Sequence, residues 1–160
     1  MTKQINKKFL FTLLIFISFI LVSAFIIEHR LGHQPCKLCL YERIPYFLSV
    51  LLIIKIFFIR IYERETLLIL SLVFIISTCL AFYHLGIEQG FFKESLACTA
   101  GNLSENITKE ELLEQLNQNI ISCKDVSFRI FGFSLAATNT IFSLILSVIF
   151  TKLFMDYGKN

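Results

Sequence analysis

Long apolar segments separated by short polar stretches dominate the chain. Residues 9–27, 66–83 and 130–151 contain no charged side chain, and each is close to the ~20 residues that a helix needs to cross ~30 Å of hydrocarbon. A fourth apolar segment, 44–61, contains Lys55 near one end and Arg60 at its edge, where long cationic side chains reach the headgroups. The pattern predicts an all-α membrane protein, with one integral domain over 1–160 built as a four-transmembrane-helix bundle.

The first apolar segment also has features of a cleavable signal peptide. Lys3, Lys7 and Lys8 lie at or before its start, and residues 22–24 (Val-Ser-Ala) resemble a cleavage site. The apolar run is longer than the about 7–15 residues of a signal-peptide core, however, and it continues past that site. We therefore expect it to remain as the first membrane span.

Composition supports a membrane protein and excludes other classes. Of 160 residues, 56% are hydrophobic and 17% are charged, against ~45–50% and ~25% in soluble domains. A chain this small exposes much of its surface, so a soluble fold could not bury so many apolar side chains. The same richness excludes intrinsic disorder. No basic stripe with interleaved aromatic side chains points to a nucleic acid as partner.

The basic residues predict the orientation in the membrane. Lys and Arg occur in both tails and around the connection between the second and third spans, whereas the loop 84–129 has four basic and seven acidic residues. By the positive-inside rule, both termini face the cytoplasm and the loops 28–43 and 84–129 face outward. The shorter outer loop also contains Arg30, Lys37 and Arg43, which weakens this bias.

The longer outer loop contains one readable element. Thr108 and Glu111 fit a helix capping box, with Thr108 as the N-cap. An apolar stripe follows at helical spacing, formed by Leu112, Leu113, Leu116 and Ile120. We expect a short amphipathic helix that packs on the helix ends or lies on the membrane surface.

Four of the five cysteines fall in the outer loops or at their borders: Cys36, Cys39, Cys98 and Cys123. Cysteines outside the cytosol tend to form disulfides, and these four allow three pairings. The fifth, Cys79, lies within the third span and is expected to be a small buried apolar residue.

Cys36 and Cys39 form a C-x-x-C pair, which proteins use for metal binding or for redox chemistry. A four-cysteine zinc site needs a second close pair, but Cys98 and Cys123 are 25 residues apart. A permanent disulfide across so small a ring adds little stability, whereas reversible dithiol–disulfide exchange suits the spacing. We therefore interpret the pair as a redox site and expect no metal.

The surroundings of the C-x-x-C pair favour a reactive thiolate. Pro45 is typical of the first turn of a helix, so the pair lies just before, or within, the N-terminal end of the second span. The positive end of the helix dipole stabilises a thiolate there. Arg43 either supports that thiolate or anchors the helix at the interface. At the membrane border, a thiol pair reaches soluble thiols as well as a lipid-soluble two-electron acceptor such as a quinone.

Three motifs relate the chain to a known family. Residues 32–46 read GHQPCKLCLYERIPY, residues 83–88 read YHLGIE, and residues 131–136 read FGFSLA. Together with the four spans and the positions of Cys98 and Cys123, they resemble the bacterial disulfide bond formation protein B (DsbB) family over essentially the whole chain.

The resemblance implies a thiol:quinone oxidoreductase of the bacterial inner membrane. Such a protein reoxidises a periplasmic thioredoxin-like dithiol oxidase of the DsbA type and passes the electrons to ubiquinone or menaquinone. Cys98 and Cys123 would form the loop disulfide that the reduced partner attacks, with Cys98 taking the mixed disulfide. Electrons would then reach Cys36 and Cys39 through a transient Cys36–Cys123 bridge.

The resemblance also assigns quinone-facing residues. Cys39 would face the quinone as a thiolate supported by Arg43. His84 matches a position near the quinone, with an interfacial histidine as the alternative. Tryptophans that members often carry are replaced here by Phe91-Phe92 and Thr138. These replacements put the detailed docking or loop packing in doubt, but not the redox relay.

Two other classes share parts of this pattern. A tetraspanin-like, non-enzymatic membrane protein would hold the outer cysteines in permanent disulfides. A vitamin K epoxide reductase-like oxidoreductase also combines four helices with a C-x-x-C and a loop pair. Its loop pair precedes the C-x-x-C, however, which is the reverse of the order in this chain.

Overall fold

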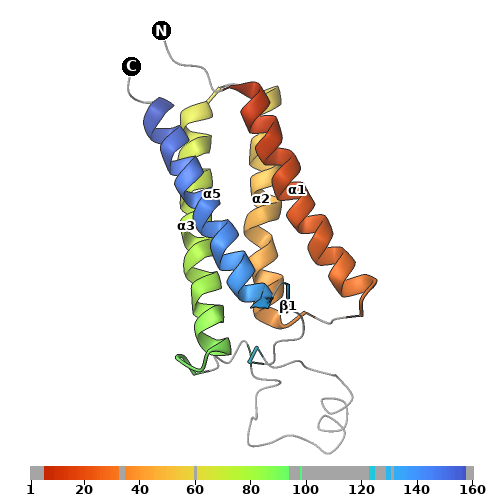
Figure 1. The fold of residues 1–160 in the computed structure, drawn as a ribbon. Helices are drawn as coiled ribbons and strands as arrows, with labels where there is room; N and C mark the ends of the chain where they lie inside the picture. Colours follow the sequence, from red (N-terminus) through yellow and green to blue (C-terminus); the bar gives the residue numbers. More distant parts are fainter. Residues whose placement is uncertain are drawn as a thin grey trace, which may run out of the picture.

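In the part of the chain that the computed structural model describes, four long helices form the fold (Figure 1): α1 (Lys7–His29), α2 (Lys37–Phe58), α3 (Glu63–Glu88) and α5 (Leu135–Tyr157). Two short strands, β1 (Arg129–Ile130) and β2 (Phe133–Ser134), pair antiparallel just before α5. The structure describes residues 6–32, 35–59, 61–93, 98, 123–124, 129–130 and 132–157. The loop helix predicted around 108–120 lies outside these residues.

The helices lie side by side and alternate in direction (Figure 1). The start of α1, the α2–α3 turn and the end of α5 lie at one end of the bundle, and the start of α2 and both strands lie at the other. The tight α2–α3 turn includes Tyr62, whose φ of 68° is left-handed. This arrangement places the start of α1 and the end of α5 at the same end of the bundle, as an even number of antiparallel helices requires.

Three of the four helices, α1, α3 and α5, are long and apolar enough to cross a membrane. In contrast, α2 contains four charged residues: Lys37, Glu42, Arg43 and Lys55. The protein is therefore a helical membrane protein, and the span predicted at 44–61 stays a prediction.

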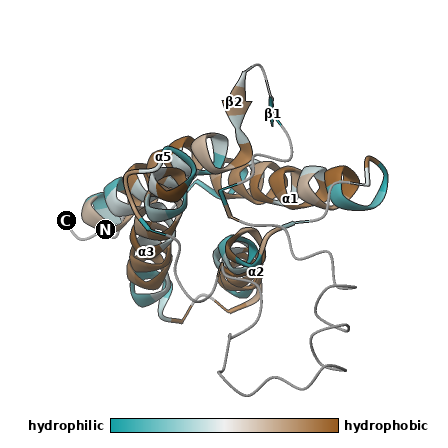
Figure 2. Ribbon diagram, turned by 90° about the horizontal axis from the view of Figure 1, so that it is seen from below, coloured by the Kyte–Doolittle hydropathy of each residue, from teal (hydrophilic) through white to brown (hydrophobic). Residues whose placement is uncertain are grey.

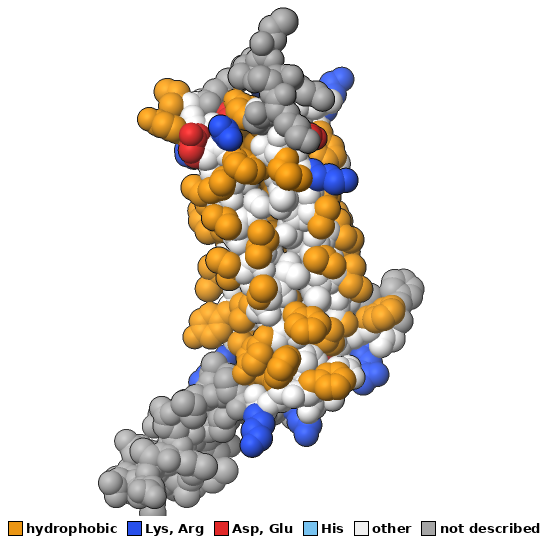
Figure 3. Space-filling view, turned by 90° about the vertical axis from the view of Figure 1, so that its left-hand side faces the viewer, with side chains coloured by type: hydrophobic (Ala, Val, Ile, Leu, Met, Phe, Trp, Pro, Cys, Tyr) orange, Lys and Arg blue, Asp and Glu red, His pale blue; other side chains and the backbone are white. Residues whose placement is uncertain are grey.

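The outer surface of the bundle is apolar. Large side chains such as Phe19, Leu51 and Ile76 are about two-thirds exposed. Figure 2 shows hydrophobic residues around the outward sides of the helices, and Figure 3 shows apolar side chains covering the middle of one face, with charged groups at its two ends. Such a belt suits a hydrocarbon environment and would be costly in water.

Aromatic stacking and small polar residues hold the helices together. The rings of Phe74 on α3 and Phe150 on α5 stack with centroids 5.4 Å apart. Ser71 and Thr151 share an interhelical hydrogen bond of 2.7 Å. Small hydroxyl residues allow close approach of helices where lipid gives no hydrophobic drive to association. The buried core also includes Leu10, Leu13, Ile17, Leu21, Tyr46, Ile53, Ile56, Leu67, Leu70 and Leu146.

Two helices begin at different residues from the predicted spans. α2 begins at Lys37, so Pro45 lies inside the helix instead of in its first turn. α5 begins at Leu135, after a β-turn with Gly132 at φ +89°, whereas the apolar segment begins at residue 130. The Ser134 side chain accepts a hydrogen bond from the Ala137 backbone N–H, which caps α5. Apolar runs alone mark the hydrocarbon-facing part of a helix and miss such caps.

Cys79 does not have the buried position that the sequence analysis expects. Its side chain is exposed on the outer face of α3. Ser77 and Ala81, two residues to either side, are buried. Two positions along a helix differ by about 200° in direction, so burial of these neighbours turns Cys79 outward.

Candidate redox site

The C-x-x-C pair occupies the first turn of α2. Cys36 is the N-cap, and its sulfur accepts a hydrogen bond from the Cys39 backbone N–H at 3.2 Å. The two Sγ atoms are 2.7 Å apart, and both residues are free thiols. Because a disulfide bond is about 2.05 Å long, closure needs little movement of the chain.

Negative charge in this pair is favoured on Cys36. A hydrogen bond from the Cys39 thiol, followed by the interaction with His84, lowers the pKa of Cys36 to about 4, although burial opposes the shift. The hydrogen bond to Cys36 and burial raise the pKa of Cys39. The family resemblance implies a thiolate on Cys39, whereas this arrangement favours a thiolate on Cys36. The Cys39 backbone N–H, which points at the Cys36 sulfur, adds a smaller contribution in the same direction.

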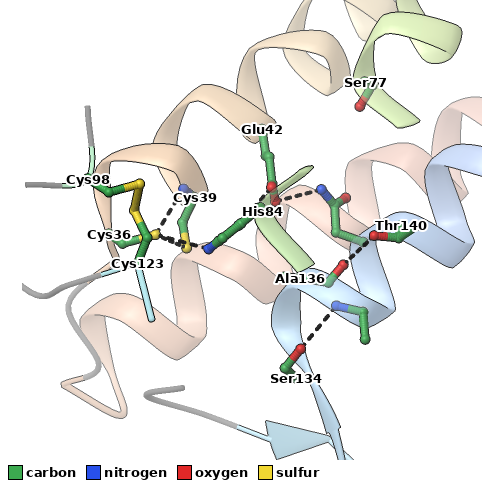
Figure 4. Close-up of polar contacts among 12 residues, drawn as sticks. Cys36, Cys39, Glu42, Ser77, His84, Cys98, Cys123, Ser134, Ala136 and Thr140 are labelled. Carbon is green, nitrogen blue, oxygen red and sulfur yellow. Dashed lines mark hydrogen bonds and ion pairs between the residues drawn. A yellow bond between two sulfur atoms is a disulfide. The ribbon is translucent and has the colours of Figure 1, made fainter. Parts of the chain in front are cut away.

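The second cysteine pair, Cys98 and Cys123, forms a disulfide beside the first pair (Figure 4). Cys36, Cys98 and Cys123 belong to one buried cluster, against which Cys39 packs. The cluster is completed by Leu38, Leu80, Tyr83 and Ile87. The fold thus brings together all four cysteines of the two outer loops, with the loop pair oxidised and the C-x-x-C pair reduced.

His84 links the thiols to a buried carboxylate. Near the end of α3, it is 2% exposed, and its Nε2 atom lies 3.5 Å from Cys36 Sγ. Its Nδ1 atom lies 2.8 Å from Oε1 of Glu42 on α2. Figure 4 shows the imidazole between the sulfur and the carboxylate. The predicted site residue His84 therefore contacts the redox pair directly.

Glu42 belongs to a polar network that the sequence analysis misses. Asn139 on α5 donates from Nδ2 to Glu42 Oε2 at 2.7 Å. The hydroxyl of Tyr46 donates to Asn139 Oδ1 at 2.6 Å and contacts Ser143 at 3.1 Å. An amide within an apolar segment is a signal for a buried partner, and Asn139 supplied that signal in the sequence.

Arg43 pairs with α1 in the structure. It forms an ion pair with Glu28 of α1, and its guanidinium lies 5.2 Å from the centre of the Phe25 ring. Among the residues that the structure describes, no hydrogen bond joins Arg43 to Cys36 or Cys39. Arg43 therefore connects α2 to α1 beside the redox pair.

An apolar cavity of about 320 Å³ lies between α1, α2 and α5. Cys39, Glu42 and Arg43 border it, whereas Cys36 and His84 do not. The rest of its wall is mostly apolar and includes Phe16, Phe19, Ile20, Ala24, Ile27, Leu135, Ala136 and Phe142. An apolar pocket with a few convergent polar groups is typical of a site for a small organic ligand.

A metal fits the cysteines less well than a disulfide does. The ligand atoms of Cys36, Cys39 and His84 lie within 4.8 Å of one another. Two sulfurs on one tetrahedral zinc, each at ~2.3 Å, would be about 3.8 Å apart. The observed 2.7 Å suits formation of a sulfur–sulfur bond.

The structure shows the contacts of Phe92 and Thr138, which stand at positions where family members often have tryptophan. The Phe92 ring packs against Tyr83, with centroids 5.5 Å apart. Gly86 makes room for it, because a Cβ atom there would lie 2.2 Å from the Phe92 ring. Thr138 borders the cavity and donates a hydrogen bond to the Ser134 carbonyl. Ring packing thus persists at Phe92, while Thr138 leaves a smaller side chain in the cavity wall.

The bundle is apolar on its outside, and it packs a reduced C-x-x-C pair against a disulfide. These two features indicate a membrane protein that carries out thiol–disulfide exchange. Residues 6–153 match the family described as "Disulfide bond formation protein DsbB". The chain belongs to the DsbB family, which confirms the resemblance in its motifs and identifies a thiol oxidoreductase of disulfide bond formation.

A curated relative agrees with this assignment. The chain is 32% identical over 162 residues to "Uncharacterized protein RP370" of Rickettsia prowazekii (strain Madrid E), an alignment that covers 99% of this chain and 93% of the relative. No solved structure matches the chain.

Proposed function

We propose that this protein reoxidises a periplasmic DsbA-type dithiol oxidase and passes the electrons to a membrane quinone, ubiquinone or menaquinone. The observation that carries the proposal is the common buried cluster of the two cysteine pairs, one oxidised and one reduced. Two adjacent pairs can exchange electrons by thiol–disulfide exchange without a further cofactor.

The exchange chemistry balances within the four cysteines. A thiolate of the reduced partner attacks Cys98, forming a mixed disulfide and releasing Cys123 as a thiolate. The partner's second thiolate then closes the partner's disulfide and releases Cys98. Cys123 next attacks Cys36 of a Cys36–Cys39 disulfide and releases Cys39. Cys98 then attacks Cys123 in the resulting bridge and releases Cys36. The products are the Cys98–Cys123 disulfide and the reduced C-x-x-C, which is the combination present in the structure.

The cavity supports a quinone as the final acceptor. Its apolar wall fits a flat, lipid-soluble ring, and the Cys39 sulfur and the Arg43 guanidinium border the same space. We propose that Cys39 and Arg43 hold the quinone there. His84 acts from behind the C-x-x-C pair, because it does not border the cavity. When bound, a quinone accepts two electrons and two protons, which matches the oxidation of one dithiol.

The orientation follows from the same proposal. With α2 as a fourth span over 44–61, both termini face the cytoplasm and the redox site faces the periplasm of the bacterial inner membrane. Lys55 of α2 donates to Thr66 Oγ1 at 3.2 Å near the α2–α3 turn, at the predicted cytoplasmic end. A lysine there can reach the headgroups.

Stopped-flow oxidation of a reduced DsbA-type protein tests the function. The purified protein with ubiquinone or menaquinone should turn over, and Cys39→Ser and Cys98→Ser should each abolish turnover. Cys79→Ser is the matched control, because Cys79 is exposed on α3 away from the site. Normal turnover by both site variants would contradict the relay. Permanent disulfides in all forms would instead favour a tetraspanin-like structural role.

A further inference from the structure

We propose that Cys36, His84 and Glu42 form a cysteine–histidine–carboxylate triad, in which His84 takes the proton of the Cys36 thiol and Glu42 holds the resulting imidazolium. This assignment rests on the proposed function, because it concerns the oxidation of the C-x-x-C dithiol. It makes His84 the proton acceptor of Cys36, while Glu42 positions His84 and then receives a proton from it.

The contacts form a continuous chain across two helices. Cys36 Sγ and His84 Nε2 are 3.5 Å apart, and His84 Nδ1 and Glu42 Oε1 are 2.8 Å apart. With Nδ1–H donating to Glu42, the Nε2 atom is free to accept the thiol proton. A carboxylate on the far nitrogen fixes this tautomer and stabilises the charged ring, as in other triads.

The side chains of His84 and Glu42 are buried, so their polar groups need hydrogen-bond partners. The side chains of His84 and Glu42 are 2% and 7% exposed. Charged groups so far from water are disfavoured unless they are paired and hydrogen-bonded. Asn139 from α5 donates to the second Glu42 oxygen, and Tyr46 orients the Asn139 amide. Both oxygens of the carboxylate therefore have a fixed donor.

The chemistry of the pair needs such an acceptor. Oxidation of the dithiol removes two electrons and two protons while one sulfur–sulfur bond forms. The Cys36 proton moves to His84 Nε2, and the electron pair left on Cys36 forms the bond to Cys39. Two electrons leave from Cys39, which borders the cavity, to the quinone-class acceptor. The Cys39 proton can leave directly into that cavity, but Cys36 does not border it.

Glu42 also gives the Cys36 proton a route to the cavity. Transfer of the Nδ1 proton from His84 to Glu42 Oε1 leaves both groups neutral. Glu42 borders the cavity that Cys36 and His84 do not reach. The two protons of the dithiol thus arrive at one space, each from a residue in its wall.

Alkylation of Cys36 by iodoacetamide tests the triad without partner or quinone. In a Cys39→Ser, Cys79→Ser background with the loop disulfide closed, Cys36 is the remaining free thiol. We expect Glu42→Gln and His84→Gln to raise the midpoint of its pH–rate profile by about one to two pH units. Glu42→Asp keeps a carboxylate at this position, so its midpoint should lie much closer to that of the background protein than the Glu42→Gln midpoint does. Among the described residues, the titratable groups that interact with the site in this background are His84 and Glu88 from α3, and Glu42 and Tyr46 from α2.

Ser71→Ala is the matched control. It also removes an interhelical hydrogen bond between α3 and α5, but away from the thiols. Its midpoint should equal that of the background protein. Unchanged midpoints in a folded Glu42→Gln or His84→Gln protein would overturn the triad. The hydrogen-bond network of Glu42 would then serve helix packing only. Either variant alone decides the matter if the other does not fold. If the midpoints shift as expected but the unmutated protein shows no turnover with a DsbA-type partner and quinone, the triad stands and the proposed function fails.

Discussion

The carboxylate of Glu28 and the guanidinium of Arg43 form an ion pair that joins α1 to α2 at the edge of the cavity. The two side chains are 25% and 14% exposed, so the pair is only partly screened by solvent. It joins two residues of the cavity wall. Its contribution can be separated from that of the redox pair.

A double-mutant cycle on Glu28 and Arg43 should give a coupling free energy of about 1 kcal/mol. Glu28→Gln leaves the Arg43 charge unpaired, and Arg43→Ala leaves the Glu28 charge unpaired, in each case beside an apolar cavity. The double variant removes both charges. Thermal unfolding of the four proteins in the same detergent measures the coupling. Additive losses of stability would show that the two helices do not depend on this pair.

The pH dependence of Cys36 labelling follows from its lowered pKa. With a pKa of about 4, the thiolate is present above that pH and is lost as the pH falls through it. Iodoacetamide labelling of Cys36 in the intact reduced pair should therefore stay nearly constant from pH 6 to 8. An ordinary thiol with a pKa of about 8.5 would speed up roughly 80-fold over that range. Mass spectrometry of the labelled peptide distinguishes the two profiles.

Gly86→Ala should destabilise the end of α3. Its new Cβ atom would lie 2.2 Å from the Phe92 ring, and overpacking of this kind costs about 1–3 kcal/mol. Combining it with Phe92→Ala removes the clash, so Gly86→Ala should cost much less in that background. Unfolding in detergent measures both steps. An equal cost in the two backgrounds would place the strain elsewhere than at the ring.

Asn139→Ala should destabilise the protein more than Tyr46→Phe. The first change removes the donor to Glu42 Oε2, and an unsatisfied buried polar group costs about 1–3 kcal/mol. The second leaves Glu42 bonded and removes only the hydroxyl that orients Asn139. Denaturation in mixed micelles gives the order of the two losses. The reverse order would mean that the Tyr46 hydroxyl has a larger role than its two contacts imply.

The sequence was sufficient for the parts of the protein that local pattern determines. Apolar runs predicted the long helices, and the resemblance to the DsbB family implied that Cys39, Arg43 and His84 lie near one quinone site. The ends of the helices were harder to predict. Cys36 caps α2 well before its apolar part begins, and Gly132 turns the chain before α5 starts.

Partnership across helices could not be predicted from pattern alone. Glu42 and Asn139 are 97 residues apart, and their hydrogen bond depends on how α2 and α5 are rotated about their axes. The same rotation turns Cys79 of α3 outward and gives Arg43 a partner on α1 instead of a sulfur. Such contacts depend on the three-dimensional packing, because the sequence of a uniformly apolar segment does not indicate which side of the helix faces its neighbours.

The disulfide between Cys98 and Cys123 closes a covalent ring, since its two residues are 25 positions apart in the chain. Thiol exchange during the proposed cycle opens and recloses this ring at every turnover. A chain that contains such a ring is more compact when denatured than the same chain opened. After acid trapping of the thiols, electrophoretic mobility under non-reducing conditions should therefore report which half of the cycle each molecule occupied.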